Sequence, residues 1–155
     1  MSLFLILLAA GDGKRFDSSI PKPFYRINNK TLLEHSFNAF SSLIKIKKTI
    51  IVYNKKHKKY LKNIKINNSI KITGGRTRQE STFKGLKFLK KMKCKKVLIH
   101  DSARPNPSPK IIKKIISLLA YNHAVVPLIK VNDATKRYKN KFIFKNIQRN
   151  SLGFS

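Results

Sequence analysis

Residues 3–15 read LFLILLAAGDGKR, an unbroken apolar run that ends in small residues, two glycines and two basic side chains. A short apolar run followed at once by glycine is typical of a strand buried on both faces, as in parallel sheets. Leu3 to Ala9 are therefore predicted to form the first strand. Open α/β sheets bind ligands beside the carboxyl ends of their strands, so the loop after Ala9 is predicted to belong to a binding site.

The rest of the chain alternates apolar runs with helical patterns, which favours an α/β fold with a parallel sheet and helices on its faces. Because they are rich in apolar and β-branched residues, four further segments are predicted to be strands: Thr49–Tyr53, Ile70–Thr73, Val97–His100 and Ala124–Ile129. The stretch around Tyr138 to Phe144 is expected to be extended or to form a hairpin.

Three helices are predicted between these strands. The first begins at a capping box formed by Thr31 and Glu34, ahead of an apolar stripe. The second covers Gln79–Met92 and the third Ile111–Leu119. The side chains expected to face inward from the second helix are Phe83, Leu86, Leu89 and Met92.

The charge balance of the chain is extreme, with 35 Lys plus Arg against 6 Asp plus Glu and a formal net charge of +29. Such a charge attracts polyanions, so nucleic acid, an anionic membrane or a phosphate-rich metabolite are the partner classes to consider. The excess consists mainly of scattered lysine pairs such as Lys55-Lys56, without a basic tail. This scatter favours solvated lysine-rich faces over a nucleic-acid footprint.

A length of 155 residues suits one domain, so residues 1–155 are expected to form a single domain. The single cysteine, Cys94, excludes an internal disulfide and fits a reducing cytoplasm, where it is expected to be a packed or surface thiol. No apolar stretch approaches the roughly 18 residues that a membrane span requires, so no membrane association is expected.

The loop after the first strand combines small residues with fixed positive charge. Four small residues allow backbone N–H groups to approach a phosphate chain closely, and they are Ala9, Ala10, Gly11 and Gly13. Arg15 and Lys22 are the candidate catalytic cations, because negative charge accumulates on phosphorus oxygens during nucleotidyl transfer. The Walker A loop and the dinucleotide-binding fingerprint are both absent.

Two later segments have motif-like compositions. GGRTRQES at 74–81 offers two glycines that can adopt positive φ beside a base edge, and the Ser81 hydroxyl at the start of a helix. HDSARP at 100–105 places Asp101 at the end of a buried strand, where a carboxylate suits Mg²⁺ or a hydroxyl group. The purely structural interpretations are a strand-to-helix turn at the first segment, and a loop Asp that caps neighbouring N–H groups at the second.

Taken together, these segments resemble the Ala-Ala-Gly-x-Gly-x-Arg loop, the Gly-Gly-x-x-Arg-x-x-Ser element and the His-Asp-x-Ala-Arg-Pro signature of the 2-C-methyl-D-erythritol 4-phosphate cytidylyltransferases. The resemblance extends from Leu3 to Gly153. It implies a three-layer Rossmann-like nucleotidyltransferase fold with an extended dimerisation arm at about 133–148. It also implies transfer of CMP from CTP to 2-C-methyl-D-erythritol 4-phosphate, with release of pyrophosphate, in non-mevalonate isoprenoid precursor synthesis.

The resemblance also implies roles for individual residues. Nucleotide binding extends to Gly75, Ser81, Asp101 and Ser102, and Asp101 also carries Mg²⁺ or another divalent cation. The acceptor substrate is contacted by Asp101, Arg104, Thr135 and Arg149, of which Arg149 holds its phosphate. Arg149 resembles a catalytic arginine that reaches from one subunit into its partner's site, which implies a homodimer.

The family pattern does not settle the acceptor or the completeness of the domain. The related ribitol-5-phosphate cytidylyltransferases share the motifs, although Ala103 favours the isoprenoid enzyme because the ribitol relatives tend to carry Val there. Asp133-Ala134-Thr135 replaces the family's Asp-Thr. Relatives continue beyond the last residue of this chain, so the domain is expected to be incomplete at its C-terminus. The sequence is also compatible with an inactive truncated remnant and with a basic nucleic-acid-binding domain.

Overall fold

The computed structural model describes residues 3–11, 19–139, 142–148 and 152–154. The chain divides into two compact units, residues 1–112 and 113–155, and each has its own strand pairs. In the described part of the chain, no helix has both the length and the apolar character needed to cross a membrane.

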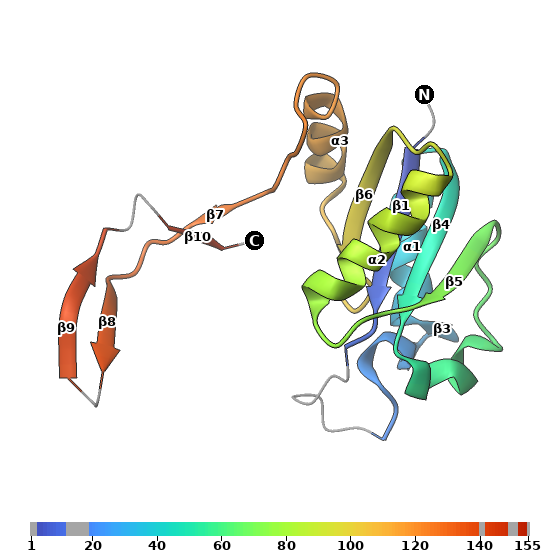
Figure 1. Ribbon diagram of the computed structural model, residues 1–155, viewed down its shortest axis with the longest axis horizontal. Helices are drawn as coiled ribbons and strands as arrows, with labels where there is room; N and C mark the ends of the chain where they lie inside the picture. The colour runs from blue at the N-terminus through green and yellow to red at the C-terminus, as the bar shows by residue number, and fades with distance from the viewer. Residues whose placement is uncertain (1–2, 12–18, 140–141, 149–151, 155) are drawn as a thin grey trace. The chain divides into compact units, whose positions relative to one another are not determined.

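Within the described residues, the first unit contains a four-stranded sheet in the order β5-β4-β1-β6, and each neighbouring pair is parallel (Figure 1). Its strands are β1 (Leu3–Ala9), β4 (Ile46–Tyr53), β5 (Ser69–Thr73) and β6 (Lys96–Asp101). All four predicted strands of this unit are confirmed. The register places Leu8 beside both Val52 and Asp101, so the carboxyl ends of β1, β4 and β6 meet at one edge of the sheet.

Helices cover both faces of this sheet, and every side chain of β1 is buried. Figure 1 shows α2 (Arg78–Lys91) on one face and α1 (Leu32–Ser41) on the other. Alternate residues of β1 and β4 pack with Leu89 of α2, in a cluster of Phe4, Ile6, Leu8, Ile50, Val52 and Leu89. Cys94 packs against the same cluster, as expected of a packed thiol. The predicted three-layer α/β fold is confirmed.

The predicted capping box at the start of α1 is confirmed. Thr31 Oγ1 accepts a hydrogen bond from the Glu34 N–H at 3.2 Å, and Glu34 Oε2 accepts one from the Thr31 N–H at 2.8 Å. Glu34 Oε1 also accepts the Lys65 N–H at 3.0 Å. This buried carboxylate therefore ties the first turn of α1 to a loop 31 residues further along the chain.

The predicted inward face of α2 is confirmed at Leu89, which belongs to the core cluster, and at Met92, which packs against that cluster, but not at Phe83 and Leu86. Phe83 and Leu86 are 65% and 38% exposed, whereas Ser81, Gly85 and Leu89 are buried at a spacing of four residues. A Cβ at Gly85 would lie 3.0 Å from Ile6 Cδ1, a tight contact that would require the Ile6 side chain to shift by a few tenths of an ångström, so glycine suits this close approach of the helix to β1. The size and hydrophobicity of Phe83 and Leu86 suggest that they face inward. In the structure, Ser81 and Gly85 are buried together with Leu89 instead.

The first unit also contains the short elements η1 (Lys22–Phe24), β2 (Arg26–Ile27), β3 (Lys30–Thr31) and η2 (Lys55–Leu61). A further helix, α3 (Pro109–Leu118), spans the boundary between the two units. β2 and β3 pair through a turn in which Asn28 and Asn29 both have positive φ, a conformation that asparagine tolerates better than most residues. The predicted third helix is confirmed, with its start two residues earlier.

In the second unit, β8 (Thr135–Lys139) and β9 (Phe142–Ile147) form an antiparallel hairpin, which confirms the expectation for this stretch. The predicted strand at Ala124–Ile129 is wrong. Only β7 (Ile129–Lys130) is a strand, and it pairs with β10 (Gly153–Phe154). A strand requires a hydrogen-bonded neighbour, and within the described residues the run before Ile129 has none.

Candidate active site

A cavity of about 450 Å³ opens at the carboxyl ends of β1 and β6. Its lining comes from all three sequence motifs and consists of Leu8, Ala10, Gly11, Lys22, Pro23, Gly75, Arg76, Thr77, Arg78, Ser81, Asp101, Ala103 and Arg104. Segments almost 100 residues apart in the sequence therefore meet at one place.

The strand order explains why the motifs meet there. The chain runs from β1 to β4 and β5 on one side, then crosses through α2 to β6 on the other side of β1. This reversal of direction beside β1 is a topological switch point, where open α/β sheets leave a crevice outside the strand ends. The loops after β1, β5 and β6 form its walls.

The first wall follows β1. Ala10 and Gly11 line the cavity, and a Cβ built on Gly11 would meet no atom of the described residues within 4 Å, so these residues leave its backbone accessible to a ligand. Lys22 lies in η1, whose Pro23 and Phe24 are buried and fix the turn. The predicted residues Gly13 and Arg15 lie outside the described residues.

The second wall is the Gly-Gly segment, where the structure corrects the predicted role of the glycines. Neither Gly74 nor Gly75 has positive φ, and close packing requires them instead. A Cβ at Gly74 would lie 2.7 Å from Ala10 Cβ, and one at Gly75 would overlap the Glu80 side chain. Gly74 therefore lies close to the loop after β1, and Gly75 lies close to the first turn of α2.

The polar contacts of this segment also differ from expectation. The N-cap of α2 is Thr77, whose hydroxyl accepts the Glu80 N–H at 3.1 Å. Ser81 lies one turn further along the helix and is only 2% exposed, and its Oγ accepts the Gly75 N–H at 3.1 Å. The hydroxyl of Ser81 thus fixes the glycine turn at the cavity wall.

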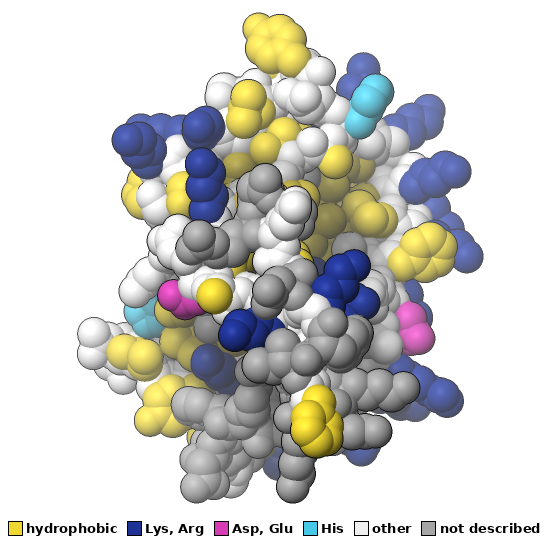
Figure 2. Space-filling model, turned by 90° about the vertical axis from the view of Figure 1, so that its left-hand side faces the viewer, with side chains coloured by type: hydrophobic (Ala, Val, Ile, Leu, Met, Phe, Trp, Pro, Cys, Tyr) yellow, Lys and Arg dark blue, Asp and Glu magenta, His cyan; other side chains and the backbone are white. Residues whose placement is uncertain are grey.

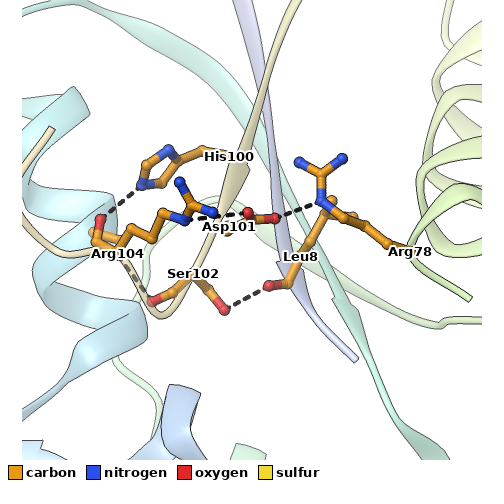
Figure 3. Close-up of polar contacts among 7 residues, drawn as sticks. Leu8, Arg78, His100, Asp101, Ser102 and Arg104 are labelled. Carbon is orange, nitrogen blue, oxygen red and sulfur yellow. Dashed lines mark hydrogen bonds and ion pairs between the residues drawn. The ribbon is translucent and has the colours of Figure 1, made fainter. Parts of the chain in front are cut away.

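The third wall is the loop after β6, and hydrogen bonds fix it at several points (Figure 3). The Ser102 N–H and hydroxyl both donate to the Leu8 carbonyl, at 3.1 and 2.7 Å. His100 Nε2 lies 2.8 Å from the Arg104 carbonyl oxygen, and its ring contacts Phe40 edge-on. Burial lowers the pKa of His100 and so disfavours the charged imidazolium, and the contacts of the ring with Arg104 and Phe40 hold the loop.

Asp101, the last residue of β6, lies between the side chains of Arg78 and Arg104 (Figure 3). Arg78 Nε donates to Asp101 Oδ1 at 2.9 Å, and Arg104 Nε lies 3.5 Å from Asp101 Oδ2. The Asp101 side chain is 28% exposed and both arginines are about two-thirds exposed, so the group remains accessible to a ligand.

The cavity has a strong positive charge. Among the described residues that line it, Lys22, Arg76, Arg78 and Arg104 face a single carboxylate, Asp101. On the face shown in Figure 2, Lys and Arg side chains occupy several separate places and acidic side chains are sparse. A concave site with clustered cations and exposed backbone suits a ligand with several phosphates.

The residues present also fit a magnesium ion that arrives with its ligand. Among the described residues, no group of three or more His, Cys, Asp or Glu side chains could hold a metal ion alone. Mg²⁺ commonly takes one or two protein carboxylates and completes its shell with substrate phosphates and water. Asp101 supplies one such carboxylate in a cavity suited to phosphates.

The predicted site residues fall into three groups. The residues that share the cavity are Ala10, Gly11, Lys22, Gly75, Ser81, Asp101 and Arg104. Ala9 and Ser102 are both fully buried and lie outside the lining, so their side chains do not face a ligand in this conformation. Thr135 lies in the second unit, and Arg149 lies outside the described residues.

Sequence reasoning missed the arginines of the second motif. Arg76 and Arg78 line the cavity, but nothing in the sequence shows that Arg78 pairs with a carboxylate 23 residues away. The available signal was the arginine within the Gly-Gly-x-x-Arg-x-x-Ser pattern, since a chain with only 6 acidic residues has few partners to offer it.

Comparison with known families agrees with this geometry. The sequence model of the 2-C-methyl-D-erythritol 4-phosphate cytidylyltransferases matches residues 3–154. The bifunctional enzyme IspD/IspF of Pelagibacter ubique is 40% identical over 98% of this chain and 41% of its own length. The 2-C-methyl-D-erythritol 4-phosphate cytidylyltransferase of Wigglesworthia glossinidia brevipalpis is 36% identical over 97% of this chain and 66% of its own length. The chain thus spans less than two thirds of either relative.

Solved structures show the same fold. The bifunctional IspDF from Campylobacter jejuni superposes with a TM-score of 0.80 at 28% identity, over 99% of this chain and 39% of that protein. The 4-diphosphocytidyl-2C-methyl-D-erythritol synthase from Anaerococcus prevotii gives a TM-score of 0.72 at 27% identity, over 99% of this chain and 66% of that protein.

Proposed function

Because this chain belongs to the 2-C-methyl-D-erythritol 4-phosphate cytidylyltransferase family, we propose that it transfers CMP from CTP to 2-C-methyl-D-erythritol 4-phosphate and releases pyrophosphate. The observation that carries the proposal is the meeting of the three motifs around one cavity, where four cations face one carboxylate in the described lining. A triphosphate and a phosphorylated acceptor together bring the negative charge that such a site accommodates.

In the proposed reaction, a phosphate oxygen of the acceptor attacks the α-phosphorus of CTP. A new phosphorus–oxygen bond forms as the bond between the α-phosphorus and the bridging oxygen breaks, and pyrophosphate leaves with that bond's electrons. The attacking oxygen is already an anion, so no general base is required. Catalysis therefore rests on alignment and on stabilisation of the developing charge.

The residues of the cavity take separate parts in this proposal. The backbone at Ala10 and Gly11 is accessible to the phosphate chain, and Lys22 stabilises charge on the reacting phosphorus. The Gly75 segment, fixed by Ser81, receives the cytosine. Arg104, at the other side of Asp101, contacts the acceptor phosphate.

Asp101 is the proposed magnesium ligand. When bound, the ion neutralises the triphosphate and the pyrophosphate that leaves. The proposal also includes a homodimer in the cytoplasm, in which the β8–β9 hairpin is the arm exchanged between subunits. In this assembly Arg149 reaches the partner's acceptor site and Thr135 contacts the acceptor. The family resemblance supports these parts of the proposal.

Pyrophosphate release measured with CTP and each of two acceptors tests the proposal. Release with 2-C-methyl-D-erythritol 4-phosphate and none with ribitol 5-phosphate is the expected result. Lys22→Ala should lower kcat by about 10²- to 10³-fold, the usual cost of losing one fixed stabilising group. Lys87→Ala, which removes an exposed charge from α2 outside the cavity, is the matched control. Release with ribitol 5-phosphate alone would contradict the proposed acceptor.

A further inference from the structure

We propose that Arg78 is a positioning residue that acts through Asp101, holding this carboxylate in the orientation in which it receives the magnesium ion of the bound nucleotide. The inference rests on the proposed function and adds a residue to which neither the sequence motifs nor the family resemblance assigned a role. Its basis is the contact between Arg78 Nε and Asp101 Oδ1 (Figure 3).

The two arginines beside Asp101 are not equivalent. Arg78 Nε lies 2.9 Å from Oδ1, within the range of a charge-assisted hydrogen bond. Arg104 Nε lies 3.5 Å from Oδ2, beyond the usual range of such a bond. Arg78 therefore makes the contact that orients the carboxylate. An ionised carboxylate offers about four lone-pair sites, so Asp101 retains acceptor capacity for a cation.

Arg78 can orient Asp101 because hydrogen bonds on both sides of Arg78 hold its backbone in place. It is the first residue of α2, directly after the Thr77 N-cap. The Arg76 N–H donates to Glu80 Oε2 at 2.8 Å, and the Gly75 N–H donates to Ser81 Oγ. The glycine segment and the first turn of the helix are thus locked together.

Asp101 is anchored from the other wall of the cavity. It ends β6, opposite Leu8 of β1, and its carbonyl accepts the Arg104 N–H at 3.0 Å. The Arg78–Asp101 contact consequently joins the wall after β5 to the wall after β6. The orientation of the carboxylate depends on both walls.

Stability alone does not account for this contact. The Arg78 side chain is 65% exposed, and ion pairs with such exposure typically contribute only about 0–1 kcal/mol. Carboxylates that bind metal ions are themselves oriented by hydrogen-bonded neighbours, and losing such a neighbour typically weakens metal affinity by about 10- to 100-fold. The location of the pair in the cation-rich cavity fits this second role.

The test measures CTP binding by calorimetry with and without Mg²⁺, so that the magnesium enhancement is the ratio of the two Kd values. We expect Arg78→Ala to reduce this enhancement by about 10-fold or more, and Arg78→Lys to restore part of it. Asp101→Asn should abolish the enhancement, and adding Arg78→Ala to Asp101→Asn should change it no further, because the two residues act as one unit. Lys87→Ala, on the exposed face of the same helix, should leave the enhancement unchanged.

Two results separate the failure of this inference from that of the proposed function. If Arg78→Ala weakens CTP binding equally with and without Mg²⁺, and equally in the Asp101→Asn background, Arg78 contacts the nucleotide directly and the inference is wrong. If the wild-type protein does not bind CTP, the proposed function is wrong and the inference fails with it. Thermal unfolding of each variant confirms that the comparison involves folded protein.

Discussion

Glu34 at the start of α1 and Asp101 at the end of β6 are both carboxylates with several partners, but the partners are of different kinds. Backbone N–H groups of Thr31 and Lys65, together with the Thr31 hydroxyl, hold Glu34, which is 7% exposed. Side-chain guanidinium groups hold Asp101, which is 28% exposed in a cavity. The backbone partners of Glu34 cannot move without unfolding part of the chain, whereas the guanidinium partners hold Asp101 at a place that stays accessible to a ligand. The first arrangement supports the fold, and the second leaves a charge available for chemistry.

The largest expected effect is that of Asp101→Asn on activity. The substitution keeps the shape of the side chain and removes the charge, so kcat should fall by about 10²- to 10³-fold. The free energy of unfolding should change by less than about 1 kcal/mol, because the ion pairs are exposed. Steady-state pyrophosphate release and denaturant unfolding measure the two quantities. If Asp101→Asn instead lowers the free energy of unfolding as well as kcat, Asp101 supports the fold as Glu34 does, and the proposed difference between the two carboxylates is wrong.

Glu34→Ala should have the opposite profile. It leaves the buried N–H of Thr31 and the partly buried N–H of Lys65 without their acceptor, so the free energy of unfolding should fall by about 2–3 kcal/mol. Glu80→Ala is the matched control, since Glu80 occupies the same third position of α2 but is exposed, and its substitution should cost less than about 1 kcal/mol. Equal losses in the two variants would show that burial does not set the role of Glu34.

A smaller effect is expected at Ser102, the neighbour of Asp101. Its hydroxyl donates to the Leu8 carbonyl, which also accepts the Ser102 N–H, so Ser102→Ala should cost about 1 kcal/mol of stability. The Kd for CTP should change by less than about threefold. A loss of CTP affinity without a loss of stability would instead support the sequence-based assignment of Ser102 to nucleotide binding.

The smallest effect concerns pH. Burial by itself would raise the pKa of Glu34, but hydrogen bonds from Thr31 and Lys65 and the nearby Arg26 outweigh it and lower the pKa. A group whose pKa is lowered on folding contributes stability above its unfolded pKa and loses it as the pH falls through the folded pKa. The stability difference between wild type and Glu34→Gln should therefore be constant above about pH 5 and shrink below it. Urea unfolding at several pH values measures the difference, and an increase at low pH would contradict this assignment.

The sequence was sufficient to predict the elements whose causes are local. The capping box of Thr31 and Glu34 depends on a three-residue spacing, and the buried strand β1 depends on an unbroken apolar run. The gathering of the motifs at one sheet edge follows from the strand-end rule for parallel sheets. Gly11, Lys22 and Asp101 could therefore be assigned to one site in advance.

Tertiary contacts decided what the sequence left out. The sheet-facing side of α2 is set by Gly85 against Ile6, so the apolar Phe83 points to solvent. The need for glycine at Gly75 comes from the position of Glu80, and the role of Arg78 comes from Asp101. In each case the deciding partner is in another turn or element, where spacing along the chain gives no information.

Titration of isotope-labelled protein with CTP and Mg²⁺, followed by amide NMR, tests the central claim most directly. If the cavity between β1 and β6 binds the nucleotide, the amide signals of Ala10, Gly11 and Gly75 should shift and saturate together. The same concentration of inorganic triphosphate should move Ala10 and Gly11 but leave Gly75 nearly unchanged, because only CTP carries a base. Unmoved signals at all three residues, with shifts confined to exposed lysines such as Lys87, would contradict the claim.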